Sequence, residues 1–270
     1  MTGTGTQADP YIVDNWADFM STSKNATYIE WDKNAENKVI DFNEIRPQGY
    51  STTVKMGGHT KYNGWVFKNF YSTASIALEF GSAGETISGV TFENLYWEVS
   101  GSASYFLHCE GNYSNKSVFD NCIFSGRIAI PSAGCFCSEI MRRCALNLSI
   151  SSLSDTFRLS YENIENSDII LDIPNVNTFI VAYRNVTNSR ISGKISATTP
   201  VKICESSTSG YNIINFESNQ PLKYVGFGIS VYNSDLAEKD SSSTNLIGCT
   251  PEQLKNAEYL YSIGFPIGVE

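Results

Sequence analysis

Phe119-Asp-Asn-Cys-Ile123 and Ile164-Glu-Asn-Ser-Asp168 are two copies of one short pattern that repeats through the middle of the chain. The pattern is an apolar residue, any residue, Asn, a small or apolar residue, and any residue. Further copies begin at Phe67, Phe92, Met141 and Val186, and Arg143 replaces Asn in one of them. The Asn positions and Arg143 fall at residues 69, 94, 121, 143, 166 and 188, with spacings of 25, 27, 22, 23 and 22 residues. The chain therefore carries an internal repeat.

A repeat of this length restricts the fold. Propeller blades and helical repeats are longer, and the Leu-x-x-Leu-x-Leu pattern of leucine-rich repeats is absent. Residues one, three and seven places after each Asn are mostly apolar or small, whereas those two places after it are mixed. Such alternation is typical of a strand with one buried face. The sequence predicts an all-β fold, a single-stranded right-handed parallel β-helix of about eight coils over residues 38–230. The hand comes from the usual preference of parallel crossovers.

The repeated asparagines are predicted to be structural. Stacked coils bring equivalent residues about 4.8 Å apart. An Asn amide can both donate and accept a hydrogen bond, and Asn tolerates left-handed turn geometry. Arg143 would have to turn outward or find a carboxylate partner. We therefore expect an internal ladder formed by Asn69, Asn94, Asn121, Asn166 and Asn188.

Both ends of the chain have the pattern of caps, which a solenoid needs to cover its open ends. In residues 1–37, a strand at 10–13 precedes a short helix whose apolar face holds Trp16 and Phe19. In residues 231–270, a polar loop precedes Thr250 and Pro251, which open a capping box with Pro at the first helical position. We expect a helical cap at each end of the β-helix.

The composition excludes several classes of function. The 270 residues carry 19 basic and 28 acidic side chains, a net charge of −9, which argues against partners such as nucleic acid or an anionic membrane surface. No apolar stretch is long enough to span a membrane. The N-terminus shows no basic region followed by an apolar core, so we expect no secretory signal. The seven cysteines are then expected to be reduced, buried thiols, and the two histidines are too few to suggest a metal site. We expect no cofactor.

Residues 3–19, Gly-Thr-Gly-Thr-Gln-Ala-Asp-Pro-Tyr-Ile-Val-Asp-Asn-Trp-Ala-Asp-Phe, resemble the opening of β-helical proteins encoded by phages and prophages of Gram-positive gut bacteria. Residues 40–45, 63–69 and 257–268 are similar to the same group, so the resemblance covers both caps and the first coils. Openings of this kind also occur on bacterial surface β-helices. The resemblance implies a virion structural protein, assembled in the host cytoplasm and displayed as a spike, fibre or decoration. It implies no catalytic residues.

Outward aromatic and apolar residues are the candidates for a binding surface or a subunit interface. They are Tyr71, Tyr96, Ile123 and Tyr105, of which the first three are predicted to share a column. An exposed apolar column favours association of copies, with trimers about the long axis as the favoured form, over binding of a ligand such as a host surface glycan. The expected partners are therefore other virion proteins and further copies of the chain.

Two alternatives remain open at this point: a polysaccharide-degrading β-helix enzyme, glycosidase or lyase, and a bacterial surface adhesin. A glycosidase needs two carboxylates at a set separation on the outer face. The candidate pairs are Glu93 with Asp120, and Glu165 with Asp168. Opposite charges occur in the same column, and these favour a solvated face with ion pairs between coils. A non-enzymatic structural role is therefore the preferred interpretation.

Overall fold

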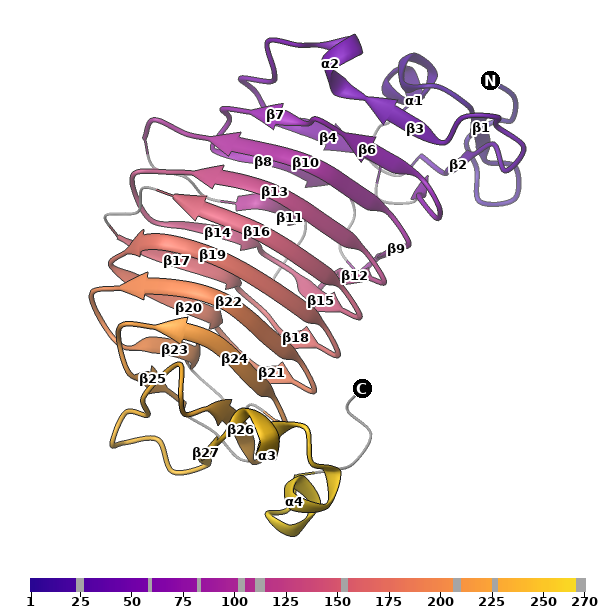
Figure 1. Ribbon diagram of the computed structural model, residues 1–270. Coiled ribbons are helices and arrows are strands. Elements are labelled where there is room, and N and C mark those ends of the chain that lie inside the picture. The colour runs from indigo at the N-terminus through magenta and orange to yellow at the C-terminus, as the bar shows by residue number, and fades with distance from the viewer. Residues whose placement is uncertain are drawn as a thin grey trace.

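The protein is all-β, with three long parallel sheets and one short one (Figure 1). This computed structural model describes residues 1–22, 27–57, 60–81, 84–101, 105–109, 115–151, 155–205, 210–224 and 228–265. Every strand pair among the described residues is parallel; the one antiparallel contact is an isolated bridge between Thr2 and Ile12. The predicted fold class is confirmed at this level.

Three sheets form the body of the molecule. Sheet 1 has eleven strands: β3 (Val39–Asp41), β6 (Val66–Lys68), β7 (Tyr71–Ser72), β10 (Thr91–Glu98), β13 (Ile123–Ala129), β16 (Ala145–Ser151), β19 (Asp168–Val176), β22 (Arg190–Ala197), β24 (Ile213–Ser218), β26 (Ser230–Asn233) and β27 (Leu246–Cys249). Sheet 2 has eight: β4 (Val54–Met56), β8 (Ile76–Phe80), β11 (Tyr105–Cys109), β14 (Gly134–Cys137), β17 (Thr156–Ser160), β20 (Thr178–Ala182), β23 (Val201–Cys204) and β25 (Leu222–Lys223). Sheet 3 has five: β9 (Thr86–Ser88), β12 (Val118–Asp120), β15 (Ile140–Arg142), β18 (Ile164–Glu165) and β21 (Val186–Thr187).

The chain visits these sheets in a fixed order. From β8 to β22, successive strands belong to sheets 2, 3 and 1 in turn, and each strand from β8 to β20 pairs with the strand three places further along the chain. Figure 1 shows the resulting stack of strands running from β3 to β27. This arrangement is consistent with a parallel β-helix. Sheet 1 continues through β26 and β27, so its strands extend past the predicted boundary at residue 230.

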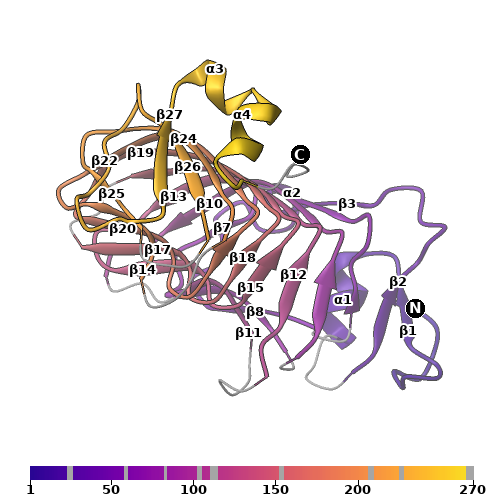
Figure 2. The ribbon, with the colours of Figure 1, turned by 90° about the horizontal axis from the view of Figure 1, so that it is seen from below.

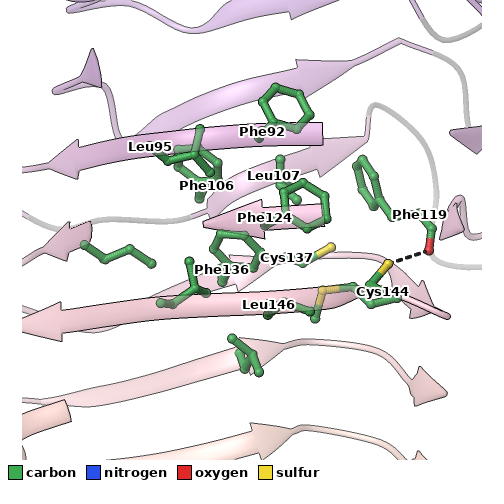
Figure 3. Packing of buried hydrophobic residues seen from close by; sticks show 14 of the residues in the cluster. Phe92, Leu95, Phe106, Leu107, Phe119, Phe124, Phe136, Cys137, Cys144 and Leu146 are labelled. Carbon is green, nitrogen blue, oxygen red and sulfur yellow. Dashed lines mark hydrogen bonds between the residues drawn. The ribbon is translucent and has the colours of Figure 1, made fainter. Parts of the chain in front are cut away.

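The core lies between the sheets and is built from rings stacked in register. Phe92 and Phe124, paired across β10 and β13, have ring centroids 5.5 Å apart and planes 8° apart. Phe106 and Phe136, on β11 and β14 of sheet 2, stack at 5.3 Å and 7°. Phe136 also meets the edge of Phe124 at 5.5 Å, which joins the two stacks (Figure 3). All four side chains are buried, as the alternation predicts.

The repeated Asn positions fall in two separate columns. The prediction that they share one register was therefore wrong. One column directly follows the strands of sheet 3 and consists of Gly89, Asn121, Arg143, Asn166 and Asn188. The backbone N–H of each of the first four donates to a carbonyl of the next coil of the chain at 2.9–3.1 Å. Asn69 and Asn94 lie five residues after Gly64 and Gly89, within sheet 1. All six Asn or Arg positions have a positive φ of 49–57°, so the prediction of left-handed turn geometry is confirmed.

The asparagines also do not form an internal ladder. Asn94 donates to Asn69 at 2.6 Å and Asn69 to Asp41 at 2.9 Å, as an axial ladder would. However, Asn94, Asn121, Asn166 and Asn188 are exposed. A buried ladder instead runs through the column one residue further along the chain. In it, one side chain of each coil accepts a hydrogen bond from a backbone N–H of the coil before it, at 3.0–3.2 Å. The accepting residues are Ser167, Ser189, Asn212 and Ser230.

The two ends differ. Helix α1 (Trp16–Thr22) lies beside the short fourth sheet of β1 (Tyr11–Val13), β2 (Ile29–Trp31) and β5 (Thr60–Lys61). Its Trp16 and Phe19 are buried, and Trp16 meets the edge of Phe67, an inward residue of sheet 1, at 6.2 Å. A further short helix, α2 (Phe42–Ile45), follows β3. The N-terminal helix therefore packs against the core.

At the C-terminus the predicted helix is two helices, α3 (Pro251–Leu254) and α4 (Ala257–Ser262). The capping box is present: the Thr250 N–H donates to Gln253 at 2.9 Å and the Gln253 N–H donates to Thr250 at 3.3 Å, with Pro251 in the first turn. The helices pack on a small apolar cluster around Val231, on the outer side of sheet 1 (Figure 2). They cover the flank of the last strands, because Val231 there points away from the main core.

Replacing Asn166 by Ala is expected to lower the free energy of unfolding by about 1 kcal/mol, whereas replacing it by Gly changes it little. The reason is backbone strain: Asn166 has a φ of 49°, and alanine tolerates this region poorly. Urea unfolding followed by circular dichroism measures both. Asn147→Ala, at an exposed position within β16, is the control and should change stability by less than about 0.5 kcal/mol. Equal effects of Asn166→Ala and Asn166→Gly would contradict the assignment.

Candidate functional site

The predicted aromatic column exists for two of its three members. Tyr71 and Tyr96 are register partners on β7 and β10, with ring centroids 5.0 Å apart and planes 14° apart. The next position in the column is Arg127, whose guanidinium carbon lies 5.2 Å from the Tyr96 ring centroid. Ile123 pairs instead with Thr91, so its predicted place in the column was wrong because of the same register error. Its side chain is 48% exposed.

Tyr105 lies apart from these residues. It belongs to β11 of sheet 2, where its register partners are Ile76 and Cys135. Its ring stacks on that of His108 at 5.2 Å. The four residues predicted as one surface are therefore divided between two sheets.

The faces of the two stacked tyrosine rings are covered. Tyr50 forms a bridge with Ser72, so Gly49, the residue before it, lies next to Tyr71 on the side opposite Tyr96. A Cβ added to Gly49 would lie 2.3 Å from the Tyr71 ring. Arg127 covers the remaining side of Tyr96. The Tyr71 hydroxyl donates to Glu98 at 3.2 Å, and partial burial together with Glu98 raises the pKa of Tyr71. A sugar ring stacks on an open aromatic face, and these faces are covered. The tyrosine column is therefore better suited to holding the coils in register than to binding a sugar.

The carboxylate pairs considered for catalysis are not brought together. Glu93 lies in sheet 1 and forms an ion pair with Lys68 at 3.2 Å. Asp120 lies in sheet 3, where Arg143 binds it through two guanidinium nitrogens, one at 2.8 Å. Arg143 thus pairs with a carboxylate, which is one of the two outcomes that the sequence predicts for it.

The second pair is also divided. Glu165, on β18 of sheet 3, stands in register with Arg142 and Thr187. Asp168, on β19 of sheet 1, is in register with Ala145 and Arg190. Each carboxylate therefore has an arginine beside it in register, Arg142 for Glu165 and Arg190 for Asp168.

The Asp120–Arg143 pair predicts a pH dependence. The hydrogen bond from Arg143, followed by the charges of Arg143 and Arg142, lowers the pKa of Asp120. A lowered carboxyl pKa stabilises the folded state above the unfolded-state pKa of about 3.9, and this contribution is lost as the pH falls further through the folded-state pKa. We expect Asp120→Asn to lose less stability than the wild type between pH 6 and pH 3 in urea unfolding. Asp172→Asn, on the face of sheet 1, is the control; an unchanged pH profile in Asp120→Asn would refute the role of the pair.

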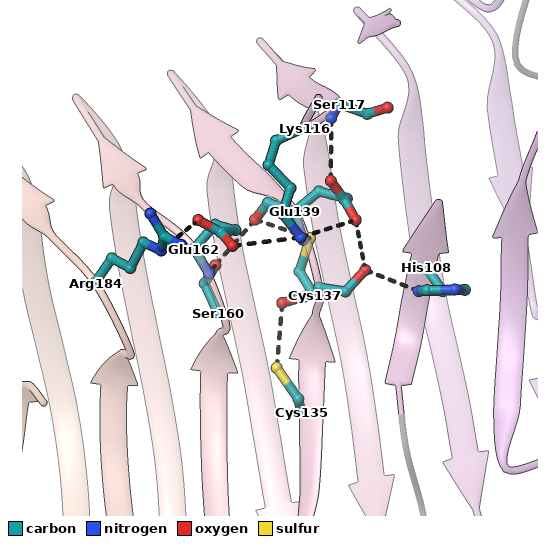
Figure 4. Close-up of polar contacts among 10 residues, drawn as sticks. His108, Lys116, Ser117, Cys135, Cys137, Glu139, Ser160, Glu162 and Arg184 are labelled. Carbon is teal, nitrogen blue, oxygen red and sulfur yellow. Dashed lines mark hydrogen bonds and ion pairs between the residues drawn. The ribbon is translucent and has the colours of Figure 1, made fainter. Parts of the chain in front are cut away.

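A buried charge network was missed by the sequence analysis (Figure 4). Lys116 Nζ lies 3.3 Å from Glu162 Oε1 and 4.0 Å from Glu139 Oε1, and Arg184 Nε lies 3.0 Å from Glu162 Oε2. Glu139 and Glu162 are each only 4% exposed. In the corner that follows sheet 2, Lys116 and the exposed Arg184 compensate the two buried carboxylates. The signal was present in the repeat, because residues 116, 139, 162 and 184 are 23, 23 and 22 places apart.

The remaining oxygens of Glu139 are also occupied. Its Oε2 accepts the Ser117 N–H at 3.0 Å and its Oε1 accepts the Ser138 hydroxyl at 2.9 Å. Because the Ser138 hydroxyl has one proton and gives it to Glu139, the His108 Nδ1 contact at 3.1 Å requires His108 to donate. This order places serine between histidine and carboxylate, whereas a catalytic triad places histidine between serine and carboxylate.

Burial raises the pKa of Glu139, and the charge of Lys116 opposes the shift. A catalytic acid would need that proton to reach a substrate. Here all four carboxylate oxygens of the network have protein partners and are screened from solvent. The network is suited to stabilising the corner between coils.

The described part of the chain contains no group of three or more His, Cys, Asp or Glu side chains placed to hold a metal ion. All seven cysteines are free and buried, and burial raises the pKa of Cys135 to about 12. None of the helices in the described ranges combines the length and apolarity that crossing a bilayer requires.

Comparison with known proteins adds no identity: no family model, no curated protein and no solved structure matches the chain.

Proposed function

We propose that the chain is a non-enzymatic structural component of a phage virion, displayed as a spike, fibre or decoration. The observation that carries the proposal is the continuous parallel pairing of the strands of sheet 1 from β3 to β27, with ring stacks and a polar ladder on the inside. Such an element is stiff along its axis and depends little on any one surface residue. The resemblance of the N-terminal residues 3–19 to phage and prophage β-helical proteins supports the virion setting.

The finer architecture belongs to the same proposal. We interpret the body as a right-handed β-helix of about eight coils, supported by the eight strands of sheet 2, one from each pass of the chain. Residues 1–37 would form the N-terminal cap, and residues 231–270 would complete sheet 1 and cover its flank with α3 and α4. This division explains why the aromatic cluster around Trp16 lies at one end only.

The pairing of the carboxylates with basic side chains supports a structural role over the enzymatic alternative. Glu93, Asp120, Glu139 and Glu162 each lie within 4.0 Å of a basic side chain. A glycosidase instead keeps one carboxyl free to protonate a leaving group. The expected result is no release of reducing ends or unsaturated products from cell-wall polysaccharides of Gram-positive bacteria. Release that survives repurification and is lost on mutation of one of these carboxylates would establish an enzyme.

Self-association is the second part of the proposal. The outer side of sheet 1 exposes Ile123 and Ile170, at 48% and 50%. Ile123 stands in register with the small residue Ala145, and Ile170 stands in register with Asn147, two residues further along β16. We propose that copies associate as trimers through this side. Light scattering coupled to size exclusion should then give three times the chain mass of 29.8 kDa. The double variant Ile123→Ser, Ile170→Ser should shift the species toward the monomer; a wild type that stays monomeric at high concentration would contradict trimer formation.

Display on the particle has its own test. Antibody raised against the purified protein, detected with gold in electron micrographs, should label intact particles released by the strain that carries the gene. Labelling confined to the bacterial envelope would instead identify a surface adhesin and overturn the virion proposal.

A further inference from the structure

A hollow of about 360 Å³ lies where two successive passes of the chain turn from sheet 1 toward sheet 2 near the C-terminal end. One wall is formed by residues 218–221, between β24 and β25, and the other by residues 234–238, after β26. Its size falls in the lower part of the range for small-molecule sites. It is separate from the tyrosine column and from the buried charge network.

The walls of the hollow are tied to each other and to the body. The Ser218 N–H donates to the Leu236 carbonyl at 3.1 Å, and the Leu222 N–H to the Glu238 carbonyl at 2.8 Å. The Asn219 side chain accepts the Ala197 N–H at 2.8 Å and donates to the Ala197 carbonyl at 3.0 Å. The Asp235 N–H donates to the Asn233 side chain at 3.0 Å. The backbone of both walls and the Asn219 side chain are therefore held in place, whereas Asp235, Leu236 and Glu238 are exposed.

Three polar side chains of the lining have no partner within the described part of the chain: Gln220, Asp235 and Glu238. The two carboxylates are strong acceptors, and the amide of Gln220 both donates and accepts. Pro221 and Leu236 supply apolar surface to the same hollow. A sugar unit has this combination of features, with hydroxyl donors around its rim and C–H groups on its faces. The described lining holds no Lys or Arg, so an anionic ligand would be repelled.

We propose that this hollow binds one uncharged, hydroxyl-rich sugar unit. The inference rests on the proposed function, since host-surface contact by a displayed protein would provide the glycan. Asp235 and Glu238 accept hydrogen bonds from hydroxyl groups of the sugar, and Gln220 fixes the orientation of the sugar. Leu236 and Pro221 contact its apolar face. The surface lies at the end opposite the N-terminal cap.

Saturation-transfer NMR on the full chain tests this directly. The probes are methyl α-glucopyranoside, methyl β-galactopyranoside and N-acetylglucosamine, with galacturonate as the anionic comparison and calcium chloride as the metal comparison. We expect transfer to at least one neutral sugar, a signal at least fivefold weaker for galacturonate, and no loss of the sugar signal on adding calcium. Asp235→Ala and Glu238→Ala should each reduce the neutral-sugar signal at least fivefold.

The matched control is Asp172→Ala, an exposed carboxylate on the face of sheet 1, which should keep the full signal. Circular dichroism establishes that all three variants are folded. No transfer to any neutral sugar, or equal loss in Asp172→Ala, would overturn the proposal, as would calcium displacing the sugar. Failure here leaves the particle labelling unaffected, so it is distinguishable from failure of the proposed function.

Discussion

Replacing Phe124 by Ala is expected to lower the free energy of unfolding by about 3–5 kcal/mol. The ring is fully buried and lies between three others: Phe92 at 5.5 Å, Phe136 at 5.5 Å and Phe119 at 6.0 Å. These neighbours come from sheets 1, 2 and 3, so the cavity would lie where all three sheets meet. Each neighbouring ring is fixed by the coils above and below it, so the walls of the cavity can move in only partly. The loss of stability therefore stays near the upper part of the range of about 3–5 kcal/mol.

Urea unfolding monitored by circular dichroism and by tryptophan fluorescence measures this loss. Ile123→Ala is the matched control, since it removes a large apolar side chain from the adjacent residue on the same strand but from the outer side. It should cost less than about 1 kcal/mol in the isolated chain. Similar losses for Phe124→Ala and Ile123→Ala would show that the inside and outside of β13 have been assigned wrongly.

Replacing Glu162 by Gln is expected to cost about 2–4 kcal/mol, the second large effect. Glu162 is buried and receives Lys116 on one oxygen and Arg184 on the other. Removing the carboxylate charge deprives Lys116, whose side chain is 17% exposed, of its ion pair at 3.3 Å, while Glu139 lies further away at 4.0 Å. Removing one member of a buried pair costs about 3–5 kcal/mol, and the 53% exposure of Arg184 reduces that figure.

The control for Glu162 is Glu93→Gln, which breaks an ion pair of similar length, 3.2 Å, between side chains that are 40% and 46% exposed. Such a surface pair contributes about 0–1 kcal/mol. The double variant Glu162→Gln, Lys116→Met should recover part of the loss, because it removes the Lys116 charge together with the carboxylate that compensates it. A double variant as unstable as the sum of both single variants would argue against a coupled network.

The repeat could be found from the sequence, but its register could not. Asn121, Arg143 and Asn166 belong to one column and were aligned correctly, whereas Asn69 and Asn94 belong to another turn five residues further on. Both columns need left-handed geometry, so both select Asn or Gly, and the pattern alone does not separate them. The true equivalent of Asn121 is Gly89, which carries no apolar-x-Asn signature, and this pass of the chain is longer than the others.

The surface was less predictable than the core, for a related reason. Alternation identifies which side chains point outward, but the column in which each stands depends on register. Ile123 was therefore placed beside Tyr96, where Arg127 stands. The charge column containing Glu139 and Glu162 followed the repeat spacing, yet its burial depends on how the corners after sheet 2 fold over it. The hollow near Asp235 depends on the shape of two turns at the end of the repeat, which carry no periodic signal.

Quantitative mass spectrometry of particles purified through a density gradient tests the central claim most directly. The particles come from the strain that carries the gene, and each fraction is measured for this chain and for the major particle protein. The proposed function predicts that the two profiles coincide, at a constant molar ratio that persists after a second gradient. A chain that stays in the cell lysate or in the envelope fraction, with none in the particle peak, would contradict a virion structural role.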